Sequence, residues 1–298
     1  MSKVVKPFLK WAGGKTQLLS DIEQRFPYGK EEKFTFIEPF VGSGAVLFWV
    51  LNHFPNVQQC IINDINTDLI NTYHTIRNDV DALIDQLDIW QSEYHALALD
   101  VERKKAYYYQ KRTDFNTKEQ PHIQQAALFI FLNRTCFNGL YRVNRSGNFN
   151  VPIGSYKTPK ICDAPNLRRV SEALQNVIIF QGDFEQTLAY AKDNTMFYLD
   201  PPYKPLSASS SFTAYAKDEF NDDEQRRLKD FCDILTEQDY PWILSNSDVS
   251  QLEENNFFDE LYDNYHINRV LAKRAINSNS GKRGNIHELL ITNQVKVA

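Results

Sequence analysis

The sequence is poor in the residues that build disulfide or zinc frameworks, and it has no long apolar run. Its 298 residues include four cysteines and six histidines, with neither a Cys-x-x-Cys nor a His-x-x-x-His spacing. This argues against a disulfide framework and a metal site, and favours reduced thiols. No apolar stretch approaches the ~18 residues that a membrane helix needs, and Met1–Lys6 lacks the apolar core of a signal peptide. We therefore expect a soluble, cytoplasmic protein without a membrane partner.

A net charge of −5 offers no general attraction for a nucleic acid, but basic residues gather locally. Binding depends on local patches rather than on the average. Two clusters stand out, and the first contains one acidic residue, Asp163. Each cluster alone is more typical of a solvated surface than of a nucleic-acid site. Their members are Arg134, Arg142, Arg145, Lys157, Lys160, Arg168 and Arg169, and then Arg269, Lys273, Arg274, Lys282 and Arg283.

Short β-branched and aromatic runs alternate with helical patterns along most of the chain. This alternation predicts an α/β fold with a Rossmann-like, doubly wound and mostly parallel sheet. The tail, His266–Ala275 and His287–Thr292, is expected to form an antiparallel pair at the edge of the sheet. The predicted strands are Lys33–Ile37, Gln59–Ile62, Val177–Phe180, Met196–Leu199 and Trp242–Leu244, and the predicted helices include Ala45–Phe54 and Asp222–Leu235.

A different pattern interrupts the alternation between Leu69 and about Leu132. Apolar residues recur there at helical spacing, which predicts helices with a buried face. A polar, glycine-containing stretch, Asn133–Tyr156, follows. We interpret Tyr73–Asp163 as an insertion into the α/β domain, helical first and a loop or hairpin after. The periodic residues are Leu69, Ile70, Tyr73, Ile76, Val80, Ile84 and Leu87.

The segment Phe36-Ile-Glu-Pro-Phe-Val-Gly-Ser-Gly44 follows a predicted strand and opens a helix. Such a turn suits a nucleotide, because glycines let the backbone approach the ligand and helix-start N–H groups point at it. Leu47 occupies the place of the third glycine of the dinucleotide fingerprint, which argues against NAD. Asp64 stands 20 residues after Gly44, where an acid can accept hydrogen bonds from ribose hydroxyls. Capping of the next helix is the alternative role for Asp64.

Trp11-Ala-Gly-Gly-Lys-Thr16 is similar to the end of a phosphate-binding loop. The Walker pattern also needs a glycine five residues before Gly14, where this sequence has Leu9, and no strand clearly precedes it. ATPase or kinase activity is therefore disfavoured.

Asp200-Pro-Pro-Tyr203 follows the apolar strand Met196–Leu199 and carries the most specific chemistry. An exocyclic adenine amine is a poor nucleophile because its lone pair is delocalised into the ring. A carboxylate and the Pro201 carbonyl could accept hydrogen bonds from its two N–H groups and so expose that lone pair. Tyr203 offers a face on which the base can stack. A sulfonium methyl donor is already activated, so positioning carries most of the catalysis and no metal is needed. An ordinary Asp-Pro-Pro turn is plausible only in isolation.

Together these motifs resemble the Dam-type DNA adenine-N6 methyltransferases, in the family's motif order and over nearly the whole chain. The resemblance implies S-adenosylmethionine as cofactor and an adenine flipped out of double-stranded DNA, within GATC, as substrate. The matching segments are Phe8–Lys15, Phe36–Gly44, Ile62–Asn66, Asn133–Asn144, Phe149–Tyr156, Asp200–Tyr203, Pro205, Leu206, Phe212, Thr213, Tyr215, Leu244–Asp248 and Lys273–Asn279.

The resemblance also implies a role for each matching residue. Asp200, Pro201, Pro202 and Tyr203 would be catalytic. Lys10 and Arg142 would each read a guanine, Leu140 and Pro152 would pack on a thymine methyl, and Phe137 would wedge into the base stack, in accord with the chemistry of the base edges. The implied cofactor residues are Trp11, Lys15, Glu38, Phe40, Gly42, Gly44, Asp64, Asp183, Phe184 and Asp200. The implied DNA residues are Lys10, Arg134, Phe137, Asn138, Leu140, Arg142, Pro152 and Tyr156.

In this interpretation residues 1–72 and 164–298 form the catalytic domain that binds S-adenosylmethionine, and residues 73–163 form the target-recognition domain. No obligate protein partner is expected. Two rival functions stay open. One is a methyltransferase for RNA or for a protein amide, although such enzymes often carry Asn in place of Asp200. The other is a catalytically idle DNA-binding regulator, which would not need Asp200–Tyr203 intact.

Overall fold

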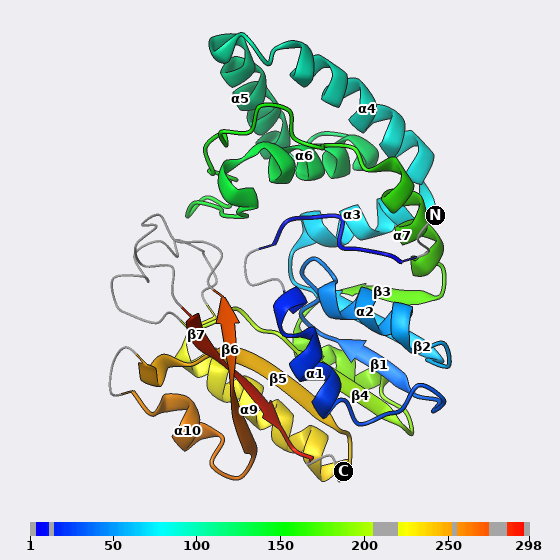
Figure 1. Ribbon diagram of the computed structural model, residues 1–298, viewed down its shortest axis with the longest axis vertical. Coiled ribbons are helices and arrows are strands. Elements are labelled where there is room, and N and C mark those ends of the chain that lie inside the picture. The colour runs from blue at the N-terminus through cyan, green and yellow to red at the C-terminus, as the bar shows by residue number, and fades with distance from the viewer. Residues whose placement is uncertain (1–3, 12–14, 205–219, 252–254, 274–284, 295–298) are drawn as a thin grey trace.

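The computed structural model describes residues 4–11, 15–204, 220–251, 255–273 and 285–294. Within them, seven strands form one sheet in the order β3-β2-β1-β4-β5-β7-β6 (Figure 1). β1 to β5 pair in parallel, whereas β7 pairs antiparallel with both β5 and β6. The strands are β1 Thr35–Glu38, β2 Gln59–Asp64, β3 Val177–Gln181, β4 Thr195–Leu199, β5 Trp242–Ser247, β6 His266–Lys273 and β7 Asn285–Thr292.

The order confirms the predicted mostly parallel α/β sheet with an antiparallel pair at one edge. Four strands continue past their predicted ends, β1 and β3 by one residue, β2 by two and β5 by three, because backbone pairing holds polar residues in register. Glu38 in β1 pairs with Ile62, and Asp64 in β2 pairs with Gln181. The strands thus carry acidic side chains at their carboxyl ends, where ligands of such sheets bind.

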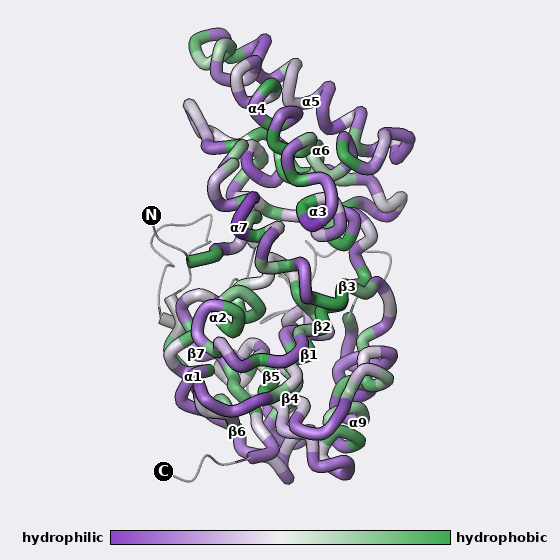
Figure 2. Tube along the Cα trace, turned by 90° about the vertical axis from the view of Figure 1, so that its right-hand side faces the viewer, coloured by the Kyte–Doolittle hydropathy of each residue, from purple (hydrophilic) through white to green (hydrophobic). Residues whose placement is uncertain are grey.

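Helices cover both faces of the sheet, so the middle residues of its central strands are largely apolar on both sides. Phe36 and Ile62 face a core that includes α2 (Ala45–His53), while Ile37 and Ile61 face a core that includes α9 (Asp222–Glu237). Figure 2 shows apolar residues gathered on the strands and on α2. The remaining short helices around the sheet are α1 Leu19–Arg25, α10 Phe257–Leu261, η1 Lys15–Gln17, η3 Phe184–Tyr190 and η4 Val249–Gln251.

The predicted helical region forms a separate layer above the sheet (Figure 1). α3 packs against α6 within this layer and also against β3 of the sheet. Residue 73, where the sequence places the start of the insertion, lies in the middle of α3. This helix therefore runs from the α/β unit into the helical layer without a break. The helices are α3 Thr67–Asn78, α4 Val80–Ala96, α5 Val101–Thr117, α6 His122–Thr135 and α7 Ala164–Leu174.

The polar stretch after α6 forms an antiparallel hairpin, which we call the recognition hairpin (residues 136–156). It opens with the short helix η2 (Phe137–Gly139), and Cys136 bridges to Ile153 while Val143 bridges to Phe149. At its turn, the Asn144 side chain accepts hydrogen bonds from two backbone N–H groups.

All four cysteines of the chain are free and buried. Among the described helices, none is long and apolar enough to cross a membrane.

Candidate active site at the carboxyl ends of the strands

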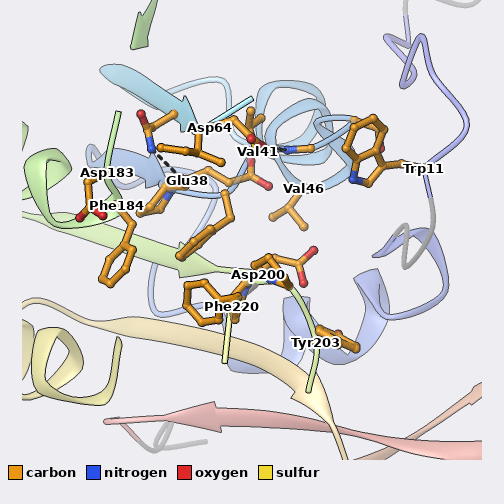
Figure 3. Close-up of a pocket in the computed structure, with 18 of the residues that line it drawn as sticks. Trp11, Glu38, Val41, Val46, Asp64, Asp183, Phe184, Asp200, Tyr203 and Phe220 are labelled. Atoms are coloured by element: carbon orange, nitrogen blue, oxygen red, sulfur yellow. Dashed lines mark hydrogen bonds between the residues drawn. The ribbon is translucent and has the colours of Figure 1, made fainter. Parts of the chain in front are cut away.

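A cavity of about 890 Å³ opens where the strand order reverses between β1 and β4. The loops after β1 to β4 line it, together with α9 and residues from the N-terminal segment and the recognition hairpin. Asp183 and Phe184 lie at one end of the cavity and Trp11 at the other, with Asp200 and Tyr203 along one side (Figure 3). The topology of a doubly wound sheet places ligands at this position.

The glycine turn after β1 depends on the absence of side chains. Gly42 and Gly44 have φ angles of 49° and 75°, which only glycine adopts without strain. A Cβ on Gly44 would lie 2.7 Å from the Tyr73 hydroxyl, and one on Gly42 would lie 3.0 Å from Trp11 Nε1. Tyr73 also donates a hydrogen bond to the Gly42 carbonyl at 3.0 Å. Of the two glycines predicted as cofactor residues, Gly42 lines the cavity, and Gly44 lies in the same turn behind it.

Asp64 is held at the end of β2 by two backbone groups. The Gly42 N–H donates to Oδ2 at 3.1 Å and the Asn66 N–H donates to Oδ1 at 3.0 Å. Asn66, not Asp64, caps α3, because its side chain accepts a hydrogen bond from the Leu69 N–H. Burial raises the pKa of Asp64, and the backbone hydrogen bonds oppose this shift. The structure thus places Asp64 in the wall of the cavity and excludes the helix-cap alternative.

Glu38, at the end of β1, is a buried carboxyl without a full set of partners. Its exposed fraction is 2%, and its Oε2 atom has no hydrogen-bond partner among the described residues. Burial and then the negative charge of Asp200 raise the pKa of Glu38 well above its ordinary value. A buried, unsatisfied carboxyl oxygen is costly. It is therefore suited to a ligand that brings a cationic or hydrogen-bonding group into the cavity.

An aromatic pocket with an ion pair forms the far end of the cavity. Asp183 caps η3, and its Oδ2 accepts a hydrogen bond from Arg227 on α9 at 2.6 Å. The Arg227 guanidinium lies 4.5 Å from the centre of the Phe184 ring, and Phe40 lies 5.3 Å from that ring. Flat apolar walls beside an acid suit an aromatic heterocycle with an amino group. Arg227 was not predicted from the sequence.

The Asp200 carboxylate, at the end of β4, is engaged through one of its oxygens. Lys15 Nζ lies 2.9 Å from Oδ1, and Ser245 Oγ on β5 donates to the same atom at 2.9 Å. Lys15 is only 4% exposed. Burial raises the pKa of Asp200, while Lys15 lowers it and favours the ionised form. Lys15, predicted as a cofactor residue, therefore forms an ion pair with the predicted catalytic acid.

The Asp200–Tyr203 segment is held in place from three neighbouring elements. Tyr203 donates a hydrogen bond from its hydroxyl to Glu288 Oε2 on β7 at 2.8 Å, and its ring lies 4.4 Å from Lys15 Nζ. Gln225 on α9 donates to the Pro202 carbonyl at 3.1 Å. Gln225 and Glu288 were not predicted, whereas Ser245 lies inside the matching segment Leu244–Asp248. The predicted Pro205, Leu206, Phe212, Thr213 and Tyr215 lie outside the described residues.

The predicted DNA residues gather on the recognition hairpin and the N-terminal segment beside it. Phe137 is 45% exposed, and Asn138, Arg142 and Pro152 are also exposed. Asn150 Oδ1 accepts a hydrogen bond from Arg142 Nε at 2.7 Å, which orients the guanidinium. These side chains are therefore available to a ligand outside the cavity.

Lys10 connects the N-terminal segment to the recognition hairpin. Its Nζ lies 3.9 Å from the Tyr156 ring, and its backbone exchanges two hydrogen bonds with the Asn133 side chain. Arg134 is half-buried and donates to the Phe8 carbonyl at 2.7 Å, and burial lowers its pKa. Arg134, near the end of α6, thus binds the N-terminal segment, and Leu140 is half-buried.

The second basic cluster is only partly described. Arg269 forms ion pairs with Asp248 at 3.0 Å and Asp259 at 2.7 Å. The charge of Arg269 is therefore paired within the fold, where it joins β6 to Asp248 and Asp259. Arg274, Lys282 and Arg283, like most of the matching segment Lys273–Asn279, lie outside the described residues.

Comparison with known proteins gives consistent matches. Residues 11–276 match the family model of D12 class N6 adenine-specific DNA methyltransferases. The chain is 49% identical to a Type II methyltransferase, M.MjaIII, of Methanocaldococcus jannaschii, over 97% of this chain and 99% of that protein. It is 37% identical to a DNA adenine methylase of Haemophilus influenzae, over 96% of this chain and 92% of that protein. It is 36% identical to a DNA adenine methylase of Escherichia coli, over 96% and 94%.

Proposed function

This chain belongs to the D12 class of N6 adenine-specific DNA methyltransferases, and from that premise we propose that it methylates an adenine flipped out of duplex DNA, within GATC. The family predicted from the sequence is confirmed by these matches. One observation carries the proposal. The Asp200–Tyr203 segment opens onto the same cavity as Glu38, Asp64 and the glycine turn, so an activating carboxylate and a nucleotide site share one space.

The cavity suits S-adenosylmethionine as methyl donor. Its walls carry five carboxyl groups and two cationic side chains, and such an excess of acid attracts a ligand with a positive charge. The unpartnered oxygen of Glu38 suits the ammonium group of the donor. Asp64 suits ribose hydroxyls, and the pocket of Asp183 and Phe184 suits the adenine. When bound, the donor supplies a methyl group on a cationic sulfur that leaves as a neutral thioether.

Asp200 would activate the target amine by accepting a hydrogen bond from one of its two N–H groups. Lys15 and Ser245 both contact Oδ1, so Oδ2 is the oxygen that can face the substrate. Burial raises the pKa of Asp200, but Lys15 lowers it and so favours the ionised form, which has no O–H donor and accepts hydrogen bonds at both oxygens. The Pro201 carbonyl would accept a hydrogen bond from the second N–H group. With both hydrogen bonds directed out of the ring plane, the nitrogen lone pair would be free to attack a methyl carbon held in line, and the methylated nitrogen would then release one proton to water.

Tyr203 would bind the flipped base by stacking. Its hydroxyl is fixed by Glu288 and one of its faces lies toward Lys15, so the ring has a defined plane. An aromatic face contributes about 1–3 kcal/mol to the binding of a base. Fixing the ring before the base arrives reduces the ordering cost of that step.

The GATC preference is proposed from the resemblance and from the placement of the recognition hairpin. Arg142 is exposed and oriented by Asn150, and an oriented guanidinium suits the two acceptors of guanine. Exposed Pro152 offers an apolar contact for a thymine methyl. Phe137 is an exposed aromatic ring beside them, where a side chain could fill the space that a flipped base leaves.

Methyl transfer from radiolabelled S-adenosylmethionine tests the proposal. Duplexes with GATC, every single-base variant of it, a scrambled duplex and an RNA of the same sequence would be compared. We expect label on adenine N6 of the GATC duplex, found by nucleoside digestion and mass spectrometry, and an Asp200→Asn control at background. Label on RNA or on protein amide nitrogen would favour the rival methyltransferases. Tight DNA binding without any transfer would favour the regulator.

A further inference from the structure

Tyr141 occupies an unusual position on the recognition hairpin. It stands between Leu140 and Arg142, to which the resemblance gives DNA contacts, yet it lines the cavity proposed for the cofactor. Its ring stacks on Trp11, with ring centres 5.9 Å apart and planes at 17°. Trp11 in turn covers Gly42, where an added Cβ would meet Trp11 Nε1 at 3.0 Å. The glycine turn, Trp11 and Tyr141 therefore form one continuous wall.

The N-terminal segment shows the same alternation. Lys10 lies against Tyr156 and Gly139 of the recognition hairpin, whereas Trp11, the next residue, lines the cavity. Consecutive residues on both segments thus serve opposite sides of one thin partition. A ligand on one side of this partition therefore contacts residues that are adjacent in sequence to those that contact a ligand on the other side.

Tyr141 is firmly tied to the hairpin and to the helical layer. Its ring lies 5.4 Å from Phe129 on α6 and 5.9 Å from Phe149 on the hairpin. Its hydroxyl lies 3.5 Å from Asp68 on α3, which also binds Lys118 at 2.6 Å. A shift of the hairpin that carries Arg142 would therefore disturb the contacts that hold the Tyr141 ring against Trp11.

We propose that Tyr141 is a cofactor-site residue supplied by the recognition hairpin, and that its stack on Trp11 couples cofactor binding to DNA binding. The inference rests on the proposed function. DNA that holds the hairpin fixes Tyr141, which fixes Trp11 over the glycine turn before the cofactor arrives. Coupling between two sites is reciprocal, so each ligand tightens the other by the same factor. An aromatic stack of this kind corresponds to about 2- to 12-fold in affinity.

Calorimetry on the full chain tests the proposal, with S-adenosylhomocysteine titrated in the absence and presence of a GATC duplex. Three variants at the stack isolate its contribution. Tyr141→Ala removes the side chain, Tyr141→Leu keeps an apolar contact with Phe129 and Phe149 without a ring, and Tyr141→Phe keeps the ring. Ser146→Ala, exposed at the turn of the same hairpin, is the matched control. Thermal melting of each variant reports on the fold.

We expect the duplex to tighten S-adenosylhomocysteine binding by wild type, Tyr141→Phe and Ser146→Ala alike. In Tyr141→Leu and Tyr141→Ala, the affinity without DNA should fall by about 2- to 12-fold, and the ratio of affinities with and without DNA should approach one. A Tyr141→Leu protein with the wild-type affinity or the wild-type ratio would overturn the inference and leave the proposed function intact. A wild-type protein that binds no S-adenosylhomocysteine would overturn both.

Discussion

Glu38→Gln should raise the free energy of unfolding of the ligand-free protein and lower its affinity for the cofactor. One substitution is thus expected to have effects of opposite sign on stability and on binding. Glutamine has the shape of glutamate and keeps an acceptor oxygen, so the packing around this 2% exposed side chain stays the same. The change removes the ionisation and replaces one carboxyl oxygen with an NH2 donor. The pKa of Glu38 is raised well above 4.5 in the folded protein, so the folded state favours the protonated form more than the unfolded state does.

The sign of the pH dependence follows from this shift. The contribution of Glu38 to stability is fully present below the unfolded pKa and is lost as the pH rises through the folded pKa. Each pH unit in that window costs the wild type about 1.4 kcal/mol, which is about 2 °C in melting temperature for a chain of this length. The gain of Glu38→Gln should therefore be near zero close to pH 4.5 and should grow toward neutral pH.

Cofactor affinity should move the other way. A hydrogen bond to a charged partner contributes about 1.5–3 kcal/mol, so losing the carboxylate should weaken S-adenosylhomocysteine about 10- to 150-fold. Melting curves at pH 5, 6, 7 and 8 without ligand, and calorimetry with ligand at pH 7.5, measure the two effects. Glu224→Gln is the matched control, because Glu224 lines the same cavity but pairs with Arg227 at 3.1 Å. If Glu38→Gln melts below wild type at neutral pH, or binds the ligand equally well, the assigned role of Glu38 is incorrect.

Three further changes give separate expected outcomes. Asp200→Asn should lower kcat by about 10²–10³ because it removes a charged acceptor that acts in the transition state, and single-turnover methylation on a GATC duplex would measure it. Retention of a tenth of the wild-type rate would contradict this role. Gly44→Ala should lower the unfolding free energy by at least 1–3 kcal/mol, since φ is 75° and Tyr73 lies 2.7 Å from the new Cβ, and urea unfolding would show it. Arg142→Ala should lose about 1–3 kcal/mol of discrimination at one base pair, whereas a phosphate contact would weaken all sequences alike and lower the salt slope by about one unit; rates on every single-base variant of GATC separate the two.

The sheet and the strand-end residues could be predicted from the sequence because their signals are local. Apolar runs between turn residues locate β1, β2 and β4, and residues just beyond them, such as Asp200, must lie at the carboxyl edge of a parallel sheet. The polar side chains of Glu38 and Asp64 suggest that β1 and β2 end before them. Both residues nevertheless belong to the strands, because backbone pairing with Ile62 and Gln181 outweighs their low strand propensity. The ends of β1, β2, β3 and β5 therefore lie one to three residues beyond the predicted ones.

The partners of those residues could not be predicted, because they come from distant parts of the chain. Gln225, Arg227 and Glu288 read as ordinary surface residues of a helix and a strand, and only the packing of α9 and β7 beside β4 and β5 brings them to the cavity. The same holds for Lys15, which the resemblance assigns to the cofactor and the fold pairs with Asp200. Pairing of charges depends on three-dimensional proximity, which residue spacing along the chain does not encode.

The interleaved strand order has a consequence for synthesis on the ribosome. β1 pairs with β4, whose first residue follows 160 positions later, and β6 has β7 as its neighbour in the sheet although β7 is made after it. β6 therefore has to wait at the edge until β7 arrives between it and β5. Glu288 reaches Tyr203 in that same step. A nascent chain that has emerged only as far as β6 thus holds every predicted catalytic residue but still lacks Glu288, the partner of the Tyr203 hydroxyl, and we expect methylation to begin only when β7 has left the ribosome.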